Sequence, residues 1–336
     1  MNRAALLMLS VGTALFVALL TWQGFGAVTS ALATAGWGLL LVALVHALPL
    51  VLDAAAIAVM FGRRGPVGLG GALLSRWVGE AVNSLLPAGQ IGGPVVMVRH
   101  LSQRGMRLRD AAAAITVITT LQAVAQVLFA VFGILLFCLY TTDNAPRNLG
   151  IAAAIATVVL AAIITCFYVA QRRGMFGHML RIASKLFGKR DWSALTSRAD
   201  SIDVAVKALY RERRRAAASF ALSFGGWLVG TVEVWLALRL LGHPVGWVDA
   251  LLLESVGQAI RGAAFAIPGS LGVQEGGYLL LAPLVGLPPD AALALSLAKR
   301  AREILLGLPG LLYLHFSERS WQRRRALSVP AIEAVD

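Results

Sequence analysis

The chain has 336 residues, of which 58% are hydrophobic and 14% charged, and its mean hydropathy is +0.75. Soluble domains are typically about 45–50% apolar and about 25% charged, so this composition excludes an ordinary soluble protein and indicates an integral membrane protein. The net charge of +13 does not indicate a nucleic-acid partner, because the basic residues cluster beside the apolar runs.

The chain opens with an apolar run at residues 4–20, which exceeds the roughly 7–15 residues of a signal-peptide core. We therefore expect an uncleaved first span whose N-terminus lies in the cytoplasm. A second span is predicted at 38–61, and a re-entrant helical hairpin follows at 68–97. Basic residues precede this hairpin and follow it from Arg99 to Arg109, so both of its ends are expected in the cytoplasm.

Two further spans are predicted at 111–140 and 149–169, before a polar segment at 171–215 that contains twelve Lys or Arg residues and four acidic ones. Its basic character predicts a cytoplasmic location, with helical pieces lying on the membrane surface. A solvated loop that only sets the topology explains the same composition equally well.

The second half begins with a span at 216–241 and continues with a second hairpin at 248–283. No basic cluster flanks that hairpin in the sequence, so both of its ends are expected outside. The sixth span, at 291–316, returns to a basic run that ends at Arg325 and predicts a cytoplasmic C-terminus.

The two hairpins are related in sequence, because residues 66–84 align without a gap on residues 244–262. Pro, Val and Gly match at the start, and polar side chains recur in register. This agreement indicates an internal repeat, with copies at 38–140 and 216–316 of a single membrane domain, residues 1–336. Each hairpin carries a predicted break rich in Pro and Gly: Pro87, Gly89, Gly92 and Gly93 in the first, and Pro268, Gly269, Gly272 and Gly276 in the second.

These elements predict an all-α integral membrane protein with about six transmembrane helices and two re-entrant hairpins in an inverted-topology repeat. One hairpin would enter from the cytoplasm and its sequence counterpart from outside. Transporters of this plan build their site near the membrane midplane, where the broken helices meet.

Charged and polar residues lie within the apolar segments, although one charge at the centre of a membrane helix costs about 2.5–3.5 kcal/mol. We expect them to converge on a shared, partly hydrated interior, with Lys299 and Glu303 pairing one helical turn apart. Asp53 and Glu233 are candidates for ion coupling. The predicted substrate path consists of Arg76, Glu80, Asn83, Glu254, Gln258, Arg261, Glu275, Lys299, Arg302 and Glu303.

Besides proton or ion coupling through Asp53, Glu233 or Glu275, two interpretations of these charges remain open. One is that they hold the two repeats together, although buried ion pairs rarely stabilise a protein more than apolar packing of the same volume. The other is a polar path for a charged or zwitterionic head group, which accounts better for so many charges.

No cofactor and no metal are expected from the sequence. Cys138 and Cys166 lie inside apolar runs and predict neither a disulfide framework nor a thiolate site. The histidines show no ligand spacing, and each is interpreted as a packed or interfacial residue: His46, His100, His178, His243 and His315.

At these residues the chain resembles the flippase-like family named after the transmembrane domain of lysylphosphatidylglycerol synthases, in particular its hopanoid-associated HpnL-like subgroup. The closest likenesses are NSLLPAGQIGG from Asn83 and AIPGSLGVQEGG from Ala266, and a basic residue in the last span, Arg300 or Arg302, also fits. Many members carry an acid after the Gly-Gly of the first hairpin, where this chain has Pro94. Any role that needs that carboxylate would fall to Glu80.

The resemblance implies a lipid translocase or lipid-transport component of the bacterial inner membrane, acting on a hopanoid or a glycolipid. Large family members add a soluble aminoacyl-transferase domain that this chain does not carry, so an enzyme is not expected. The expected partners are membrane lipids with an anionic or zwitterionic head group, or a hopanoid, and not nucleic acid. A homo-oligomer and lipid-biosynthetic enzymes are further candidate partners.

Two alternatives to transport remain. A membrane scaffold would recruit biosynthetic enzymes through residues 171–215. A membrane-embedded transferase using a lipid-linked donor is the weaker alternative.

Overall fold

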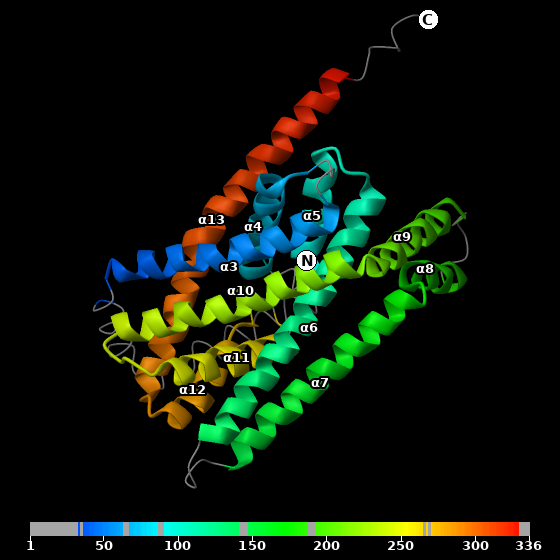
Figure 1. The fold of residues 1–336 in the computed structure, drawn as a ribbon. Helices are drawn as coiled ribbons and strands as arrows, with labels where there is room; N and C mark the ends of the chain where they lie inside the picture. Colours follow the sequence, from blue (N-terminus) through cyan, green and yellow to red (C-terminus); the bar gives the residue numbers. More distant parts are fainter. Residues whose placement is uncertain are drawn as a thin grey trace, which may run out of the picture.

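A computed structural model shows the arrangement of the chain (Figure 1), and the regular structure of its described residues is helical throughout. The prediction of an all-α membrane protein is confirmed for this part of the chain. The predicted first span and the break residues Pro87, Gly89, Pro268 and Gly269 lie outside it. The described residues are 33, 36–62, 67–86, 91–140, 147–186, 193–264, 267 and 270–328.

Three of the described helices are long and apolar enough to cross a membrane: α3 (Gly38–Phe61), α6 (Leu108–Tyr140, of which Leu108–Leu136 qualifies) and α10 (Arg213–Leu240). Two more, α7 (Arg147–Arg172) and α13 (Pro289–Ser328), coincide with the predicted spans at 149–169 and 291–316. At 1.5 Å per residue, α13 is roughly 60 Å long, so it continues well past the predicted span.

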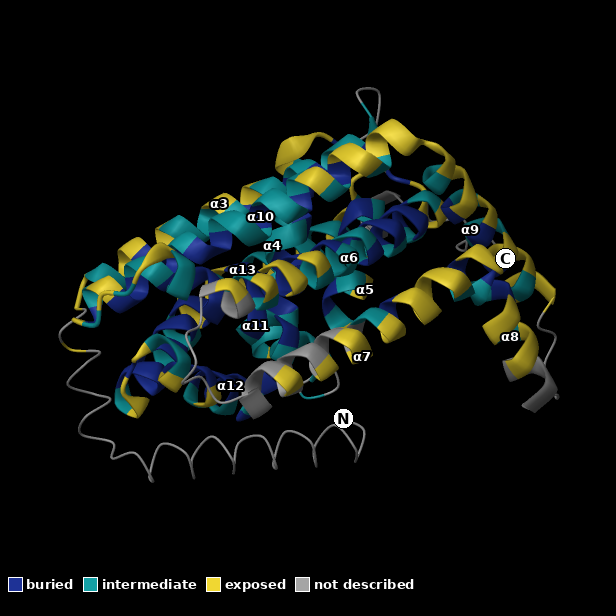
Figure 2. Cartoon of the chain, turned by 60° about the horizontal axis from the view of Figure 1, so that its bottom comes forward, coloured by how far each residue is buried: buried dark blue, intermediate teal, exposed yellow. Residues whose placement is uncertain are grey.

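Helices α3 and α10 lie side by side and antiparallel in Figures 1 and 2. A methyl group added at Gly38 would come within 2.9 Å of the Leu240 side chain, and one at Gly62 would come within 2.9 Å of Arg215. The two helices therefore meet closely at both ends. Their central parts each contribute a charged residue, Asp53 on α3 and Glu233 on α10, to the inside of the bundle.

Each predicted hairpin forms a pair of short helices. The first pair is α4 (Leu69–Leu85) and α5 (Gly92–Gln103), and the second is α11 (Trp247–Ala263) and α12 (Val273–Leu281), which the 3₁₀ helix η3 (Ala282–Val285) extends. Figure 1 shows the first pair above the α3–α10 pair and the second below it, with α13 running past both. That the two pairs are re-entrant and form an inverted repeat stays a prediction.

The basic segment at 171–215 is folded into two helices, α8 (Met175–Leu186) and α9 (Ser193–Arg211). Asp203 on α9 is buried, and it accepts hydrogen bonds from the backbone N–H groups of Phe176 and Gly177, at 3.2 and 2.8 Å. Because α9 also packs on α6, this pair is joined to the membrane part. Its expected place on the membrane surface stays a prediction.

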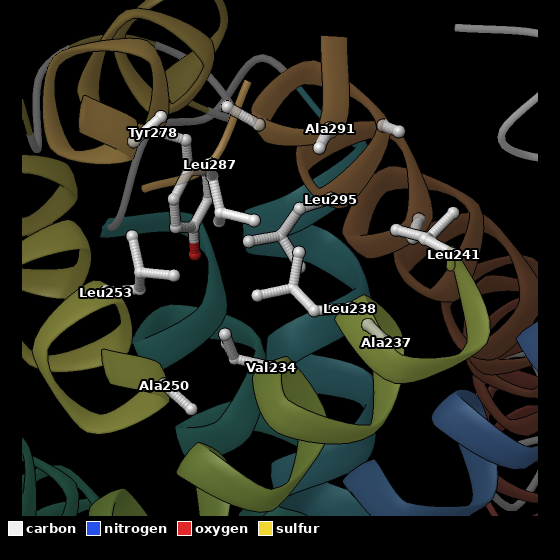
Figure 3. Close-up of a cluster of buried hydrophobic side chains, with 14 of the residues drawn as sticks. Val234, Ala237, Leu238, Leu241, Ala250, Leu253, Tyr278, Leu287, Ala291 and Leu295 are labelled. Carbon is white, nitrogen blue, oxygen red and sulfur yellow. The ribbon is translucent and has the colours of Figure 1, made fainter. Parts of the chain in front are cut away.

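The apolar core consists of two clusters on different helices. One combines residues of α10, α11, α12 and α13 around Leu238, Leu253 and Leu295, as Figure 3 shows. The other combines α3, α4, α5 and α6 around Ile57 and Ile118. The outward surface carries many exposed apolar side chains, and Figure 2 shows exposed residues along α7. Such a surface is typical of contact with lipid.

Candidate functional site

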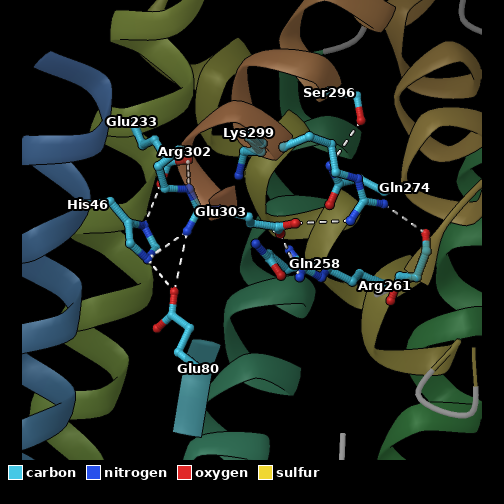
Figure 4. Close-up of polar contacts among 12 residues, drawn as sticks. His46, Glu80, Glu233, Gln258, Arg261, Gln274, Ser296, Lys299, Arg302 and Glu303 are labelled. Atoms are coloured by element: carbon cyan, nitrogen blue, oxygen red, sulfur yellow. Dashed lines mark hydrogen bonds and ion pairs between the residues drawn. The ribbon is translucent and has the colours of Figure 1, made fainter. Parts of the chain in front are cut away.

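Arg302 forms the centre of the charged residues inside the bundle. Arg302 is 4% exposed and lies thirteen residues after the start of α13, or roughly 20 Å along the helix. The guanidinium lies 3.2 Å from Glu233 Oε1 on α10, 3.4 Å from Glu80 Oε1 on α4, and 3.8 Å from Glu303 Oε1. One cation thus links the last span, the first hairpin and α10, as Figure 4 shows.

His46 on α3 joins the same group. Its Nδ1 lies 2.7 Å from Glu233 Oε2, its Nε2 lies 2.8 Å from Glu80 Oε1, and Arg302 Nη1 lies 2.7 Å from the same Nε2. His46 is thus packed inside the bundle rather than grouped with metal ligands, and it also takes part in the ion pairs, a role that the sequence analysis does not assign to it. A sequence signal was present, because His46 and Asp53 are seven residues apart and share one face of α3.

On the first hairpin, Arg76 connects this centre to Asp53. It donates from Nε and Nη2 to Asp53 Oδ2, at 2.9 and 2.8 Å, and lies 3.6 Å from Glu80 on its own helix. Asn83 of the predicted path is used within the hairpin instead, because its side-chain oxygen accepts the N–H of Gly93 at 2.7 Å. The predicted path residues of α4 thus divide between ion pairing and hairpin closure.

Toward the second hairpin, Glu303 of α13 pairs with two cations besides Arg302. Arg261 of α11 lies 2.8 Å from it, and Arg300 lies 3.0 Å from it. Arg300 also contacts Glu275 of α12 at 3.1 Å and donates to the backbone carbonyl of Ser270 at 3.3 Å. The ion pairs therefore continue from α13 into both helices of the second hairpin.

Lys299 pairs with Glu254 of α11 at 2.6 Å, and both side chains are almost fully buried. The expected pair between Lys299 and Glu303 is wrong, because each residue has a closer partner of opposite charge on α11. Gln258 supports this pair by donating its side-chain N–H to Glu254 at 2.9 Å. Lys299 and Glu254 thus form a neutral pair beside Arg302.

Glu275 also has a structural role at the start of α12. Its Oε2 accepts the backbone N–H of Gly272 at 2.7 Å, while its Oε1 accepts the Ser296 hydroxyl at 3.0 Å. Gly272 has φ +77°, a left-handed conformation that a side chain would strain. Of the predicted break residues that are described, Gly272 is therefore required by its backbone. Gly276 has open space around its Cα, and Gly92 begins α5.

We use the name charge network for the connected ion pairs of six helices, α3, α4, α10, α11, α12 and α13. It consists of His46, Asp53, Arg76, Glu80, Glu233, Arg261, Glu275, Arg300, Arg302 and Glu303.

A small pocket between α3, α4 and α13 reaches the charge network. Two carboxylates line it, Glu80 and Glu303, and the side chain of Glu80 is 24% exposed. The Trp77 ring forms part of the wall, with its indole N–H donated to the Leu306 carbonyl at 2.8 Å. The remaining lining residues are Leu50, Ala81, Ser84, Leu306 and Gly307. Of the two carboxylates, Glu80 is the accessible one, because the side chain of Glu303 is only 3% exposed.

The charged side chains of this site are suited to ionic and hydrogen-bonding ligands. Its guanidiniums can take phosphate or carboxylate groups, and its carboxylates can take ammonium or hydroxyl groups. Within the described part of the chain, no three His, Cys, Asp or Glu residues are grouped so that they could hold a metal ion.

Comparison with known proteins finds one family. A family model described as "Lysylphosphatidylglycerol synthase TM region" matches residues 7–310. That range includes most of the predicted first span, both hairpins and every residue of the charge network. No curated protein and no solved structure matches the chain.

Proposed function

The chain belongs to the lysylphosphatidylglycerol synthase TM region family, and from this premise we propose that it moves the head group of a lipid across the bacterial inner membrane. Family membership itself supports a membrane protein with a lipid-related function. Translocation, the inner membrane, a hopanoid or glycolipid substrate, and a role without enzymatic catalysis are our proposals.

The observation that carries the proposal is the charge network itself. It places nine charged residues and His46 inside a bundle whose outer surface is apolar. Each charge costs about 2.5–3.5 kcal/mol at the centre of a membrane helix. A buried ion pair seldom stabilises a protein more than apolar packing of the same volume does. Stability alone therefore gives a weak reason for the network, whereas a polar head group needs such a path.

Glu80, whose side chain is 24% exposed, is the member of the network at which we place the first contact with a head group. The lipid tails would remain against the apolar side chains of α3 and α13 that face outward, among them Leu44, Leu48 and Leu312. The head group would then displace Arg302 or Arg261 from a carboxylate and advance by exchanging partners. Movement between the two hairpins would carry it from one leaflet to the other.

The test is reconstitution of the purified protein in liposomes with fluorescent lipids of several head-group classes. If the protein transports the lipid, labelled lipid should move between the leaflets faster than in protein-free liposomes. The measurement is the rate at which the accessibility of the label to an impermeant quencher changes. Arg302→Ala should reduce that rate at least about tenfold, the kinetic equivalent of about 1.4 kcal/mol. Arg319→Ala, the same change at an exposed arginine of the same helix, should stay within about twofold of wild type.

The scaffold is the alternative that a specific feature supports, namely the folded pair of α8 and α9 on the basic segment. It is favoured if no lipid moves in liposomes although the protein is folded. Removal of basic side chains from α9 would then release bound biosynthetic enzymes, whereas Arg302→Ala would leave them bound.

A further inference from the structure

The charge network has one more carboxylate than it has guanidiniums. The acids are Asp53, Glu80, Glu233, Glu275 and Glu303, and the bases are Arg76, Arg261, Arg300 and Arg302. Lys299 and Glu254 cancel each other. The network is therefore electrically neutral only when one further proton is bound, and His46 is its remaining titratable member.

The contacts of His46 also require a choice of protonation state. With Nδ1–H donated to Glu233, the neutral ring can accept the Arg302 N–H at Nε2, but Glu80 then faces the same nitrogen without a proton between them. The protonated ring can donate from Nε2 to Glu80, but Arg302 then meets a second N–H. Nε2 thus has two competing partners, Glu80 and Arg302, and the protonation state of the ring determines which of them it binds.

The charged groups that contact His46 lie on three other helices. Glu80 and, behind it, Arg76 lie on α4, Glu233 lies on α10, and Arg302 lies on α13. On α3 itself, Asp53 is the nearest charged residue of the network. Two carboxylates favour the imidazolium and one guanidinium opposes it, so a movement of Arg302 shifts the balance toward protonation.

We propose that His46 is the proton-binding residue that couples proton uptake to release of Arg302. When His46 binds a proton, its Nε2–H is donated to Glu80, and Arg302 turns away from the ring. The Nη1–H group released from the ring then binds an anionic group of the lipid head, such as a phosphate or carboxylate, while the guanidinium keeps its contacts with Glu233 and Glu303. When the proton leaves, Nε2 accepts an Arg302 N–H again and the head group is released. This proposal rests on the proposed lipid transport.

The proposed coupling has a definite direction with pH. Because protonation frees Arg302, capture of the head group should become faster as the pH falls through the titration of His46, and then level off. In proteoliposomes the wild-type rate should change at least about threefold between about pH 5 and about pH 8.5, the interval in which histidine titrates. His46→Gln should show a rate that changes less than about 1.5-fold over that interval.

The control is His178→Gln, which changes an exposed histidine of α8 and should keep the wild-type pH profile. A wild-type profile retained in His46→Gln would overturn the proposal. If His46→Gln does not fold, the test uses wild-type protein with ¹⁵N-labelled histidine and arginine, in which nuclear magnetic resonance reports the ring protonation and the arginine side chains directly.

The resonance measurement also separates this proposal from the proposed function, because it needs no transport. A buried histidine that gains one proton over the interval, with a simultaneous shift of an arginine side-chain resonance, supports the switch. The Arg302→Lys variant should remove that arginine signal. If the His46 ring keeps one protonation state throughout, the switch is overturned, even if lipid transport is observed. If His46 titrates but no lipid moves in liposomes, only the proposed transport is rejected.

Discussion

At the scale of single residues, Arg302 and Glu233 test whether the charges serve transport or only stability. Removing one partner of a buried pair leaves an uncompensated charge, which typically costs about 3–5 kcal/mol. We therefore expect Arg302→Gln alone to lower the melting temperature strongly, and Glu233→Gln combined with it to restore most of the loss. The measurements are thermal unfolding in detergent and lipid transport in liposomes.

Transport separates the two interpretations in this double variant. A head-group path predicts that Glu233→Gln with Arg302→Gln is folded but inactive. A folded double variant with the transport rate of the wild type would show that the charges only hold the helices together. Arg319→Gln is the matched control for loss of an arginine from α13.

Glu318 gives a pH-dependent contribution outside the predicted span. Hydrogen bonds from Arg99, at 2.6 and 2.7 Å, hold the pKa of the Glu318 carboxyl below its ordinary value. A lowered pKa means that the stabilisation is present above the unfolded value of about 4.3 and is lost as the pH falls through the folded value. Because the pair is exposed, it contributes less than about 1 kcal/mol.

We therefore expect Glu318→Gln to lower the melting temperature slightly at neutral pH and not at acidic pH. Thermal unfolding at pH values on both sides of about 4 measures this difference. An equal loss at both values would show that the contribution comes from packing rather than from charge.

At the scale of elements, the first hairpin depends on a close crossing of two glycines. A methyl group at Gly93 would lie 2.5 Å from the backbone oxygen of Gly79, so α4 and α5 would have to separate. We expect Gly93→Ala to cost about 1–3 kcal/mol. Gly70→Ala is the control, because a methyl group there meets no atom within 4 Å and should be neutral or slightly stabilising. Equal melting temperatures for the two variants would contradict the crossing.

The pair of α8 and α9 depends on Asp203, whose carboxylate accepts two N–H groups at the start of α8. Loss of such a cap costs about 0.5–2 kcal/mol. We expect Asp203→Ala to increase proteolysis and hydrogen exchange within residues 175–211 without changing the spans. Asp200→Ala, which removes only the exposed pair with Arg181, should change protection much less. Equal protection from proteolysis and hydrogen exchange in both variants would show that the cap does not hold α8 and α9 together.

At the scale of the whole molecule, the predicted topology has both termini and Arg107 in the cytoplasm, with Pro244 outside. The native Cys138 and Cys166 would first be replaced by Ser, since Cys166 is exposed. We expect a cysteine at Pro244 to react with an impermeant thiol reagent in intact cells, and one at Arg107 to react only after lysis. The two residues are exposed at the ends of different helices. The reverse labelling pattern would reject the inverted repeat.

The sequence by itself determined the helices, because apolar runs of membrane-spanning length leave the backbone few alternatives to internal hydrogen bonding. The predicted span at 38–61 coincides with α3, and the predicted hairpins coincide with the two pairs of short helices. Charges that interrupt apolar runs are expected inside, and Glu233, Glu254 and Arg302 are buried, whereas Arg239, which also interrupts such a run, is exposed.

Only the tertiary structure decided which charges are partners. Spacing along a helix shows that two side chains share a face, but the helix packed against that face supplies the neighbour. Lys299 therefore meets Glu254 rather than Glu303, and His46 meets Glu80 and Glu233, which are 34 and 187 residues away in the sequence. Electrostatic attraction depends on distance in space, which packing sets and sequence separation does not.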